Sequence, residues 1–257
     1  MVTKPKTWVA LYDMHYPKID MPTFNAAMDF MRRNKIEGLI LGGDQFDNEC
    51  ISHHTKGKPL LRLPGAYKRD EDGFREDILK PLEALYLNKQ VWIVGNHDHW
   101  EHQLIEEQPE LQGLIDRTES LKLRAKDWTI VELGHSYLLG KLHVIHGELL
   151  TGIGNQGGTF PAKKAVELYA ANVLAGHTHS PQSFTKVCPV ERVQKWMGHI
   201  APILGRVNPG NLKSRPTAWL NGFVIIEFHK AGNFNCFPVI VSEGRFSYGG
   251  KVYSEAD

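Results

Sequence analysis

Short apolar segments alternate with polar segments along the first two thirds of the chain, and this pattern predicts helices and strands in alternation. Apolar, β-rich runs predict strands, whereas apolar residues recurring every three or four positions predict helices. Residues 44–72, a long polar stretch that holds two Pro and two Gly, are predicted to form one extended loop. The predicted strands span 7–12, 37–41, 90–94, 128–133, 135–139, 141–145, 172–175, 223–228 and 234–241. The predicted helices span 21–33, 74–87, 100–118 with a break at Pro109, and 159–171.

The order of these elements is βαβ-like at first and increasingly β-rich later. It favours an α/β protein in which two sheets form a layered sandwich with helices outside. The chain has no internal repeat and no low-complexity segment, and 257 residues suffice for one large core. We therefore expect residues 1–257 to form a single domain.

A polar cluster follows directly after each of five predicted strands. Because ligand sites gather at the carboxyl ends of strands in α/β sheets, we expect the five clusters to converge. The glycines beside them suit tight turns where the backbone approaches a ligand. The clusters are Asp13-Met14-His15, Gly43-Asp44-Gln45-Phe46-Asp47, Gly95-Asn96-His97-Asp98, His146-Gly147 and Gly176-His177-Thr178-His179.

The residue types of the clusters are those of metal ligands. Asp supplies hard oxygen, Asn a neutral carbonyl oxygen and His an imidazole nitrogen, and no thiolate is involved. This mixture suits Mn, Fe or Zn better than Mg or Ca. Single clusters such as His146-Gly147 are weak signals, and residues 95–98 are the strongest. All five in succession, each after a strand, are not explained by chance.

These motifs resemble the calcineurin-like metallophosphoesterase superfamily, which is marked by D-x-H, G-D-x-x-D, G-N-H-[DE], H-G and G-H-x-H in this order. The resemblance covers residues 13–179. It implies an α/β fold built as a four-layer αββα sandwich, with two mixed β-sheets flanked by helices and a metal site at the C-terminal ends of strands. It also implies two divalent metal ions, for which we expect Mn, with Fe, Zn and Ni as alternatives. The implied ligands are Asp13, His15, Asp44 and His179 for one ion, and Asp44, Asn96, His146 and His177 for the other, so that Asp44 bridges the two.

The resemblance further implies a phosphoesterase in which a metal-bridging hydroxide attacks phosphorus. His97 is expected to stabilise the developing charge or to protonate the leaving oxygen, and Asp98 to orient the His97 imidazole. The alternative for His97 is a packing role. Asp47 is expected to lie beside the ligands. Many relatives carry Arg where this chain has Asn48, which removes a familiar phosphate contact.

Two basic segments, 51–69 and 186–215, follow metal motifs and are expected to border the site. Basic walls suit an extended polyanion such as nucleic acid, whereas ordinary solvated loops are the alternative. The leading interpretation is a phosphodiesterase or nuclease acting on nucleic acid or nucleotide. The alternatives are a phosphomonoesterase, resembling a Ser/Thr protein phosphatase or a small-nucleotide phosphatase, and a non-catalytic scaffold. The candidate substrate-binding residues are His53, His54, Lys56, Arg69, Lys186 and Arg192.

Composition adds little to this picture. The net charge of +1 excludes a chain that is polybasic throughout, so attraction to a polyanion must be local. The three cysteines form no C-x-x-C pair, no apolar run is long enough to span a membrane, and the first residues do not resemble a signal peptide. We therefore expect a cytoplasmic protein with no membrane partner. Residues 198–219, rich in Gly and Pro, are expected to shape either substrate entry or a subunit contact.

Overall fold

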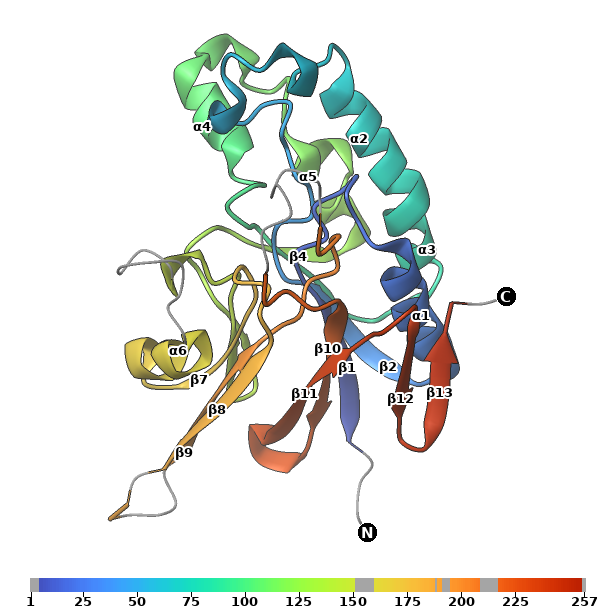
Figure 1. The fold of residues 1–257 in the computed structure, drawn as a ribbon, viewed down its shortest axis with the longest axis vertical. Helices are drawn as coiled ribbons and strands as arrows, with labels where there is room; N and C mark the ends of the chain where they lie inside the picture. Colours follow the sequence, from blue (N-terminus) through green and yellow to red (C-terminus); the bar gives the residue numbers. More distant parts are fainter. Residues whose placement is uncertain (1–4, 151–159, 188, 191–194, 209–216, 256–257) are drawn as a thin grey trace.

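The computed structural model describes residues 5–150, 160–187, 189–190, 195–208 and 217–255. Two β-sheets pack face to face, and helices cover both outer faces, which makes four layers (Figure 1). The predicted αββα sandwich of two mixed sheets is thus confirmed. Arg192 lies outside the described residues.

The first sheet has six strands in the order β11-β10-β1-β2-β3-β4. Strands β1 to β4 run parallel to one another, and β10 and β11 extend the sheet in antiparallel fashion. The carboxyl ends of β1, β2 and β3 therefore meet at one edge of the molecule. The strands are β1 (Lys6–Leu11), β2 (Ile36–Leu41), β3 (Gln90–Ile93), β4 (Trp128–Val131), β10 (Gly222–Phe228) and β11 (Phe234–Ile240).

The second sheet has five strands in the order β5-β6-β7-β9-β8. Its central strands β6, β7 and β9 are parallel, and its edges are antiparallel. A separate hairpin, β12–β13, packs beside the first helix of the chain. The strands are β5 (Tyr137–Leu139), β6 (Leu142–Val144), β7 (Asn172–Ala175), β8 (Gln182–Val187), β9 (Lys195–Ile200), β12 (Arg245–Tyr248) and β13 (Lys251–Ser254).

Helices α1 (Met21–Arg33), α2 (Ala66–Phe74), α3 (Lys80–Glu83), α4 (Trp100–Glu107), α5 (Arg117–Ser120) and α6 (Pro161–Tyr169) complete the fold. The boundaries predicted for α1 are confirmed, because its apolar stripe and its capping residue are both local signals. The Asp20 side chain accepts a hydrogen bond of 3.0 Å from the Thr23 amide at the helix N-terminus. Among the described residues, no helix is long and apolar enough to cross a membrane.

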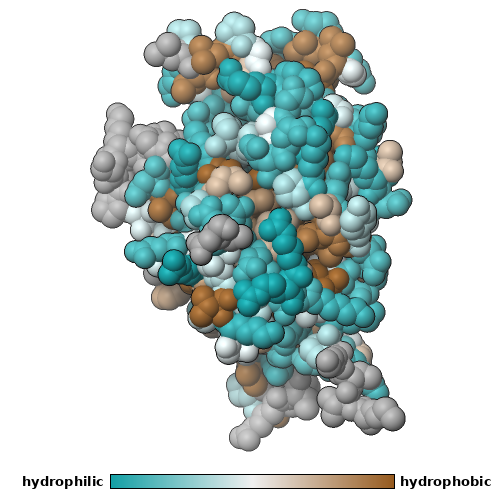
Figure 2. All heavy atoms as spheres, turned by 90° about the vertical axis from the view of Figure 1, so that its right-hand side faces the viewer, coloured by the Kyte–Doolittle hydropathy of each residue, from teal (hydrophilic) through white to brown (hydrophobic). Residues whose placement is uncertain are grey.

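Alternating side chains of the first sheet fill two separate cores. Val9 and Leu11 belong to the same buried cluster as Phe24 of α1, whereas Ala10 belongs to a second buried cluster together with Leu174 of β7. A third core lies between the second sheet and α6. Figure 2 shows a face that is mostly hydrophilic, with hydrophobic residues in small separate groups, as expected where helices turn their polar sides outward.

Several sequence predictions of secondary structure need correction. The loop predicted at 44–72 contains two short 3₁₀ turns, and α2 begins within it at Ala66, directly after Gly65, which adopts φ +74°. The helix predicted at 74–87 is α2 continued through a π turn at Arg75–Leu79 into α3. The strands β8, β9, β12 and β13 were not predicted. The exposure of most side chains along β8 explains why it shows no clear apolar alternation.

Candidate metal centre

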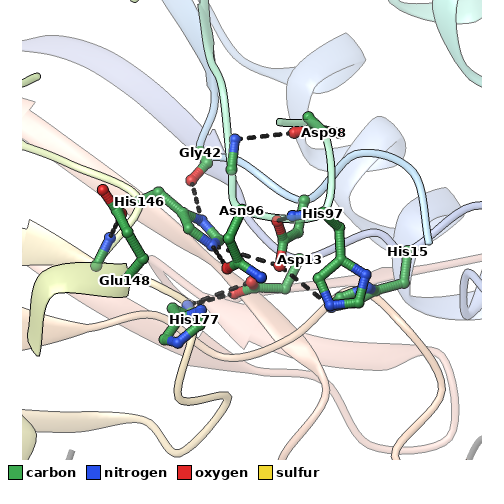
Figure 3. A network of polar contacts seen from close by, with 12 residues as sticks. Asp13, His15, Gly42, Asn96, His97, Asp98, His146, Glu148 and His177 are labelled. Atoms are coloured by element: carbon green, nitrogen blue, oxygen red, sulfur yellow. Dashed lines mark hydrogen bonds and ion pairs between the residues drawn. The ribbon is translucent and has the colours of Figure 1, made fainter. Parts of the chain in front are cut away.

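The seven predicted ligands lie on loops that leave the carboxyl ends of β1, β2, β3, β6 and β7, and their donor atoms lie close together. Figure 3 shows Asp13, His15, Asn96, His146 and His177 at this place. Backbone hydrogen bonds tie these loops together. The Asp13 amide donates to the Gly43 carbonyl at 3.1 Å, and the His15 amide donates to the Asp44 carbonyl at 2.9 Å. Segments far apart in the sequence thus form one rigid edge at which polar groups gather.

The first group of donor atoms comes from Asp13, His15 and His179, whose ligand atoms lie within 4.8 Å of one another. The Nε2 atoms of His15 and His179 are 3.3 Å apart, and His179 Nε2 is 3.4 Å from Asp13 Oδ1. All three residues are buried. These are three of the four side chains predicted for one ion.

The second group comes from Asp44, His146 and His177, again with ligand atoms within 4.8 Å. Asn96 joins it, because its Oδ1 lies 3.0 Å from His146 Nε2. Asp44 Oδ2 is 3.3 Å from His146 Nε2 and 3.9 Å from His15 Nε2, so a single carboxylate oxygen lies between the two groups. This is the position that the predicted bridging role requires.

The geometry of the groups fits metal ions. Two imidazole ligands of one tetrahedral ion, each about 2.0–2.1 Å from it, are about 3.3 Å apart, and the Nε2 atoms of His15 and His179 have this separation. The donor set contains only carboxylate and amide oxygens and imidazole nitrogens, which suits first-row transition metals. Zinc, manganese, iron and nickel all remain compatible with it.

A hydrogen bond orients the His146 ring and an ion-pair contact orients the His15 ring, so that Nε2 of each faces the centre. Nδ1 of His146 lies 3.1 Å from the Gly42 carbonyl, and Nδ1 of His15 lies 3.3 Å from Asp47 Oδ1. Metal-binding imidazoles commonly donate their second N–H to a carbonyl or carboxylate in this way, which fixes the ring and its tautomer.

The electrostatics of the centre also favour cations. Burial raises the pKa of Asp44, but the imidazoles of His146 and His97 outweigh it and hold this pKa well below its usual range. Burial lowers the pKa of His146, but the Asp44 carboxylate dominates and raises it to about 10. Burial and the charge of His146 lower the pKa of His177 to about 4. The carboxylates thus create a negative potential in which positive charge is stabilised.

Five of the seven predicted ligands adopt left-handed backbone conformations. Their φ angles are 53° at Asp13, 48° at His15, 52° at Asp44, 64° at His177 and 58° at His179. Non-glycine residues in this region cost about 1–3 kcal/mol each and cluster at functional sites. The concentration of such residues at this edge supports a functional role for it.

Two glycines make the close packing of the loops possible. A Cβ at Gly43, where φ is +104°, would lie 2.2 Å from His146 Nδ1. A Cβ at Gly95 would lie 2.2 Å from both the amide nitrogen and Oδ1 of Asp44. Any larger residue at either position would displace a predicted ligand.

His97 lies at the mouth of the centre, with a ligand atom within 4.8 Å of those of His15 and Asp44. Its ring packs on Trp100, with centroids 4.0 Å apart, and its Nδ1 lies 2.9 Å from the Asp47 carbonyl oxygen. The prediction that Asp98 orients this ring is wrong. The Asp98 carboxylate instead accepts hydrogen bonds from three backbone amides, at Gly95 (2.9 Å), Phe46 (3.2 Å) and Gln45 (3.4 Å).

Asp47 occupies the position that was expected of Asp98. Its carbonyl oxygen holds His97 Nδ1, and its carboxylate Oδ1 lies 3.8 Å from the same atom. The carboxylate also contacts His15 Nδ1 and, through Oδ2, Lys18 Nζ at 2.6 Å. One residue therefore positions a predicted metal ligand and the predicted catalytic histidine together.

Sequence reasoning missed Arg117, which is only 2% exposed. Its guanidinium lies between the rings of Phe46 and Tyr67, with Cζ 3.7 and 4.1 Å from their centroids, and it contacts Glu101 at 3.6 Å. Nη1 of Arg117 also donates to Asn48 Oδ1, and Asn48 Nδ2 donates to the His97 carbonyl at 2.8 Å. Through Asn48, the buried Arg117 thus supports the loop that carries His97.

The predicted substrate-binding residues are not brought together. His53 and His54 are exposed, and their rings lie 6.2 and 5.8 Å from Trp100, next to His97. Lys56 pairs with Glu107 at 2.9 Å, and Arg69 is exposed on α2.

Lys186 is far from the centre, although Arg206 of the same basic segment (186–215) lines a cavity with His15, His97 and His179. It pairs with Trp196 near the tip of the β8–β9 hairpin, whereas the other end of this hairpin, where Gln182 pairs with Ile200, adjoins Ala175 at the end of β7. In Figure 1 the hairpin extends to the lower left, away from the other strands. The antiparallel return of β8 carries this cation away from the metal centre.

No family model matches the sequence, and no curated protein matches it. Solved structures that resemble it include vacuolar protein sorting 29 from Cryptosporidium parvum, with 10% identity, a TM-score of 0.48, and coverage of 98% of this chain and 96% of that one. The nuclease MPE from Pseudomonas putida has 16% identity and a TM-score of 0.37, covering 96% of this chain and 86% of that one. A dimetal phosphatase from Danio rerio has 9% identity and a TM-score of 0.43, covering 89% and 94%. At such TM-scores these likenesses assign no activity to this chain.

Proposed function

We propose that this chain is a calcineurin-like metallophosphoesterase that hydrolyses phosphodiesters of nucleic acid or nucleotides. It would use two divalent metal ions, for which manganese is the first choice. The observation that carries the proposal is the pair of donor groups, Asp13/His15/His179 and Asp44/His146/His177, with Asp44 between them and His97 beside both. Two divalent cations bound there would supply Lewis-acid activation of water and neutralise charge on the phosphate oxygens.

The residues around the ions perform the remaining tasks. Nδ1 of His97 faces the Asp47 carbonyl, which leaves Nε2 available to the substrate. In hydrolysis a new P–O bond forms from water, the P–O bond to the leaving alcohol breaks, and the leaving oxygen takes a proton from His97 Nε2. The ring recovers a proton from the water that is consumed. When protonated, His97 forms an ion pair with Asp47 Oδ1 at 3.8 Å.

The aromatic surroundings of His97 support a diester. Trp100 with His53 and His54 lies on one side of the ring, and Trp219, whose centroid is 4.5 Å from that of His179, lies toward the first donor group. A phosphodiester carries two organic groups, and each could contact one of these two aromatic surfaces. A phosphomonoester carries one organic group and would contact only one of them.

The test is hydrolysis by the manganese-loaded protein of bis-p-nitrophenyl phosphate, p-nitrophenyl phosphate, and single- and double-stranded DNA and RNA. We expect cleavage of the diester and of at least one nucleic acid. His97→Ala should lower kcat by about 10²–10⁴ with metal content unchanged, because it removes a general acid. His135→Ala, at an exposed histidine in the turn before β5, is the control and should leave kcat unchanged.

Two outcomes would overturn the proposal. Cleavage of the monoester alone, with every nucleic acid intact, would favour the phosphomonoesterase alternative. A protein that retains no metal after incubation with manganese and hydrolyses neither ester would favour the scaffold.

A further inference from the structure

A cavity of about 260 Å³ opens beside the first donor group. The buried His15 and His179 line it together with the half-buried His97 and Trp219 and the exposed Arg206. We propose that this cavity binds the leaving nucleoside of the substrate, with its base stacked on Trp219 and its next phosphate held by Arg206. This inference rests on the proposed phosphodiesterase function and names the substrate of the same site.

The cavity lies on the leaving-group side because His97 lines it. The group that donates a proton to the leaving oxygen must lie within hydrogen-bond reach of it. The alcohol that departs from phosphorus therefore extends from His97 into the space that His97 shares with Trp219. The attacking water approaches from the opposite side of the phosphorus.

The Trp219 ring is half-buried and held in place by its neighbours. Its centroid lies 4.5 Å from that of His179 at an interplanar angle of 78°. The amide of the next residue, Leu220, donates to the His179 carbonyl at 3.4 Å, and the Leu220 carbonyl accepts from Ile203 at 3.0 Å. An indole fixed beside a reacting phosphate is a stacking platform for a base.

Arg206 is positioned by the loop after β1. Its amide donates to the Lys18 carbonyl at 2.8 Å, and the Gly205 amide donates to the Asp13 carbonyl at 2.8 Å. Lys18 also lines the cavity, but its ammonium contacts Asp47 at 2.6 Å and Glu49 at 2.8 Å. Among the described residues no carboxylate pairs with the exposed Arg206, so its guanidinium is available to a phosphate, which it can bind through two N–H groups.

The size of the cavity selects an unpaired nucleotide. Pockets for drug-sized ligands measure roughly 300–1,000 Å³, so a volume of about 260 Å³ suits one nucleoside rather than a base pair. A base can stack on Trp219 only when it has left its own duplex. Single strands and short oligonucleotides are therefore the expected substrates.

The test compares three diesters with the manganese-loaded protein: a dinucleoside monophosphate, the same compound with a further phosphate on the leaving nucleoside, and a diester of two aliphatic alcohols. Trp219→Ala should raise KM for both nucleotides about fivefold to 150-fold, the effect of one stacked base, and should raise KM for the aliphatic diester less. Trp219→Phe should restore most of the affinity. Arg206→Gln should raise KM about tenfold to 150-fold only for the substrate with the further phosphate.

Two variants on the side of the first sheet away from the metal centre, near the amino ends of its strands, serve as matched controls. Tyr86, an aromatic residue that is 90% exposed, precedes β3, and Arg32 is exposed in the last turn of α1. Tyr86→Ala and Arg32→Gln should leave every KM unchanged. If Trp219→Ala has no larger effect on the nucleotides than on the aliphatic diester, the nucleoside subsite is refuted while the phosphodiesterase stands.

A binding measurement decides the case in which no diester is cleaved, which would refute the proposed function. A nucleoside 3′,5′-bisphosphate is titrated into the zinc-loaded protein while tryptophan fluorescence is recorded. Quenching that Trp219→Phe abolishes would support the subsite as a nucleotide-binding site without catalysis. Identical titrations of wild type and Trp219→Phe would refute it.

Discussion

Replacing Arg117 by methionine tests the buried polar network behind the metal centre. The guanidinium pairs with Glu101, which is 9% exposed, and also holds Asn48. Methionine keeps much of the packing between Phe46 and Tyr67 but leaves the Glu101 carboxylate without its cation. Removing one partner of a buried ion pair costs about 3–5 kcal/mol, more than the pair itself contributes.

The assay is urea and thermal unfolding with excess chelator, so that metal binding does not contribute. We expect the free energy of unfolding to fall by about 3–5 kcal/mol and Tm by roughly 6–20 °C, at about 2–4 °C per kcal/mol for a chain of this size. Arg117→Met/Glu101→Gln should recover a large part of the loss. Arg124→Met is the control, because Arg124 is 61% exposed and its ion pairs with Glu119 and Glu132 contribute about 0–1 kcal/mol.

The pH dependence of the loss has a definite sign. Burial raises the pKa of Glu101, and the charge of Arg117 opposes this rise. Without Arg117, the pKa of Glu101 in the folded state therefore lies further above its unfolded value of about 4.3. A carboxyl whose pKa is higher in the folded state loses stability as pH rises from the unfolded toward the folded pKa. The deficit of Arg117→Met should therefore be smallest near pH 4 and grow toward pH 7. A loss below about 1 kcal/mol at pH 7, or a double variant no more stable than the single one, would refute the reasoning.

Three further predictions concern the metal centre. Asp47→Asn should weaken manganese binding or lower kcat about tenfold to hundredfold, measured by chelator competition and steady-state kinetics, because it loosens both histidines that Asp47 holds; unchanged values would contradict this role. Gly95→Ala, whose Cβ would lie 2.2 Å from Asp44, should abolish metal binding in calorimetry, whereas Gly113→Ala, at a left-handed glycine with open space around it, should bind normally. Because the pKa of His146 is about 10 and a ligand imidazole must be neutral, zinc binding at pH 7 should release a proton from this ring. The affinity for zinc should then rise up to about tenfold per pH unit above pH 7. Calorimetry in buffers of different ionisation enthalpy measures the proton release, and a zinc affinity that does not change with pH would contradict the prediction.

The sequence predicted the features that depend on local signals. Each ligand cluster directly follows a strand, so its place at the edge of the sheet follows from the strand's own pattern. Helix α1 has a capping Asp20 at one end and an apolar stripe throughout, and its boundaries are confirmed. The layers followed from the order of the elements.

Contacts between distant segments could not be predicted in the same way. Asp98 adjoins His97 in the sequence, but its carboxylate turns toward the amides of the β2 loop, and Asp47 from that loop reaches His97 instead. Arg117 meets Asn48 from 69 positions away. Lys186 is remote because β8 runs antiparallel to β9, away from the metal centre. The sequence did not predict β8 because most of its side chains are exposed and it has little apolar patterning.

The left-handed turns at the centre restrict which side chains evolution or design can place there. Asp, Asn and His are the residues that, after glycine, most readily accept positive φ, and they are also the residues that bind these metals. Backbone and ligand chemistry therefore select the same residue types at Asp13, Asp44 and His177. A glutamate at position 44 would change the reach of the carboxylate and also disfavour the turn beneath it. To copy this centre into another scaffold, one would have to transplant whole loops rather than side chains.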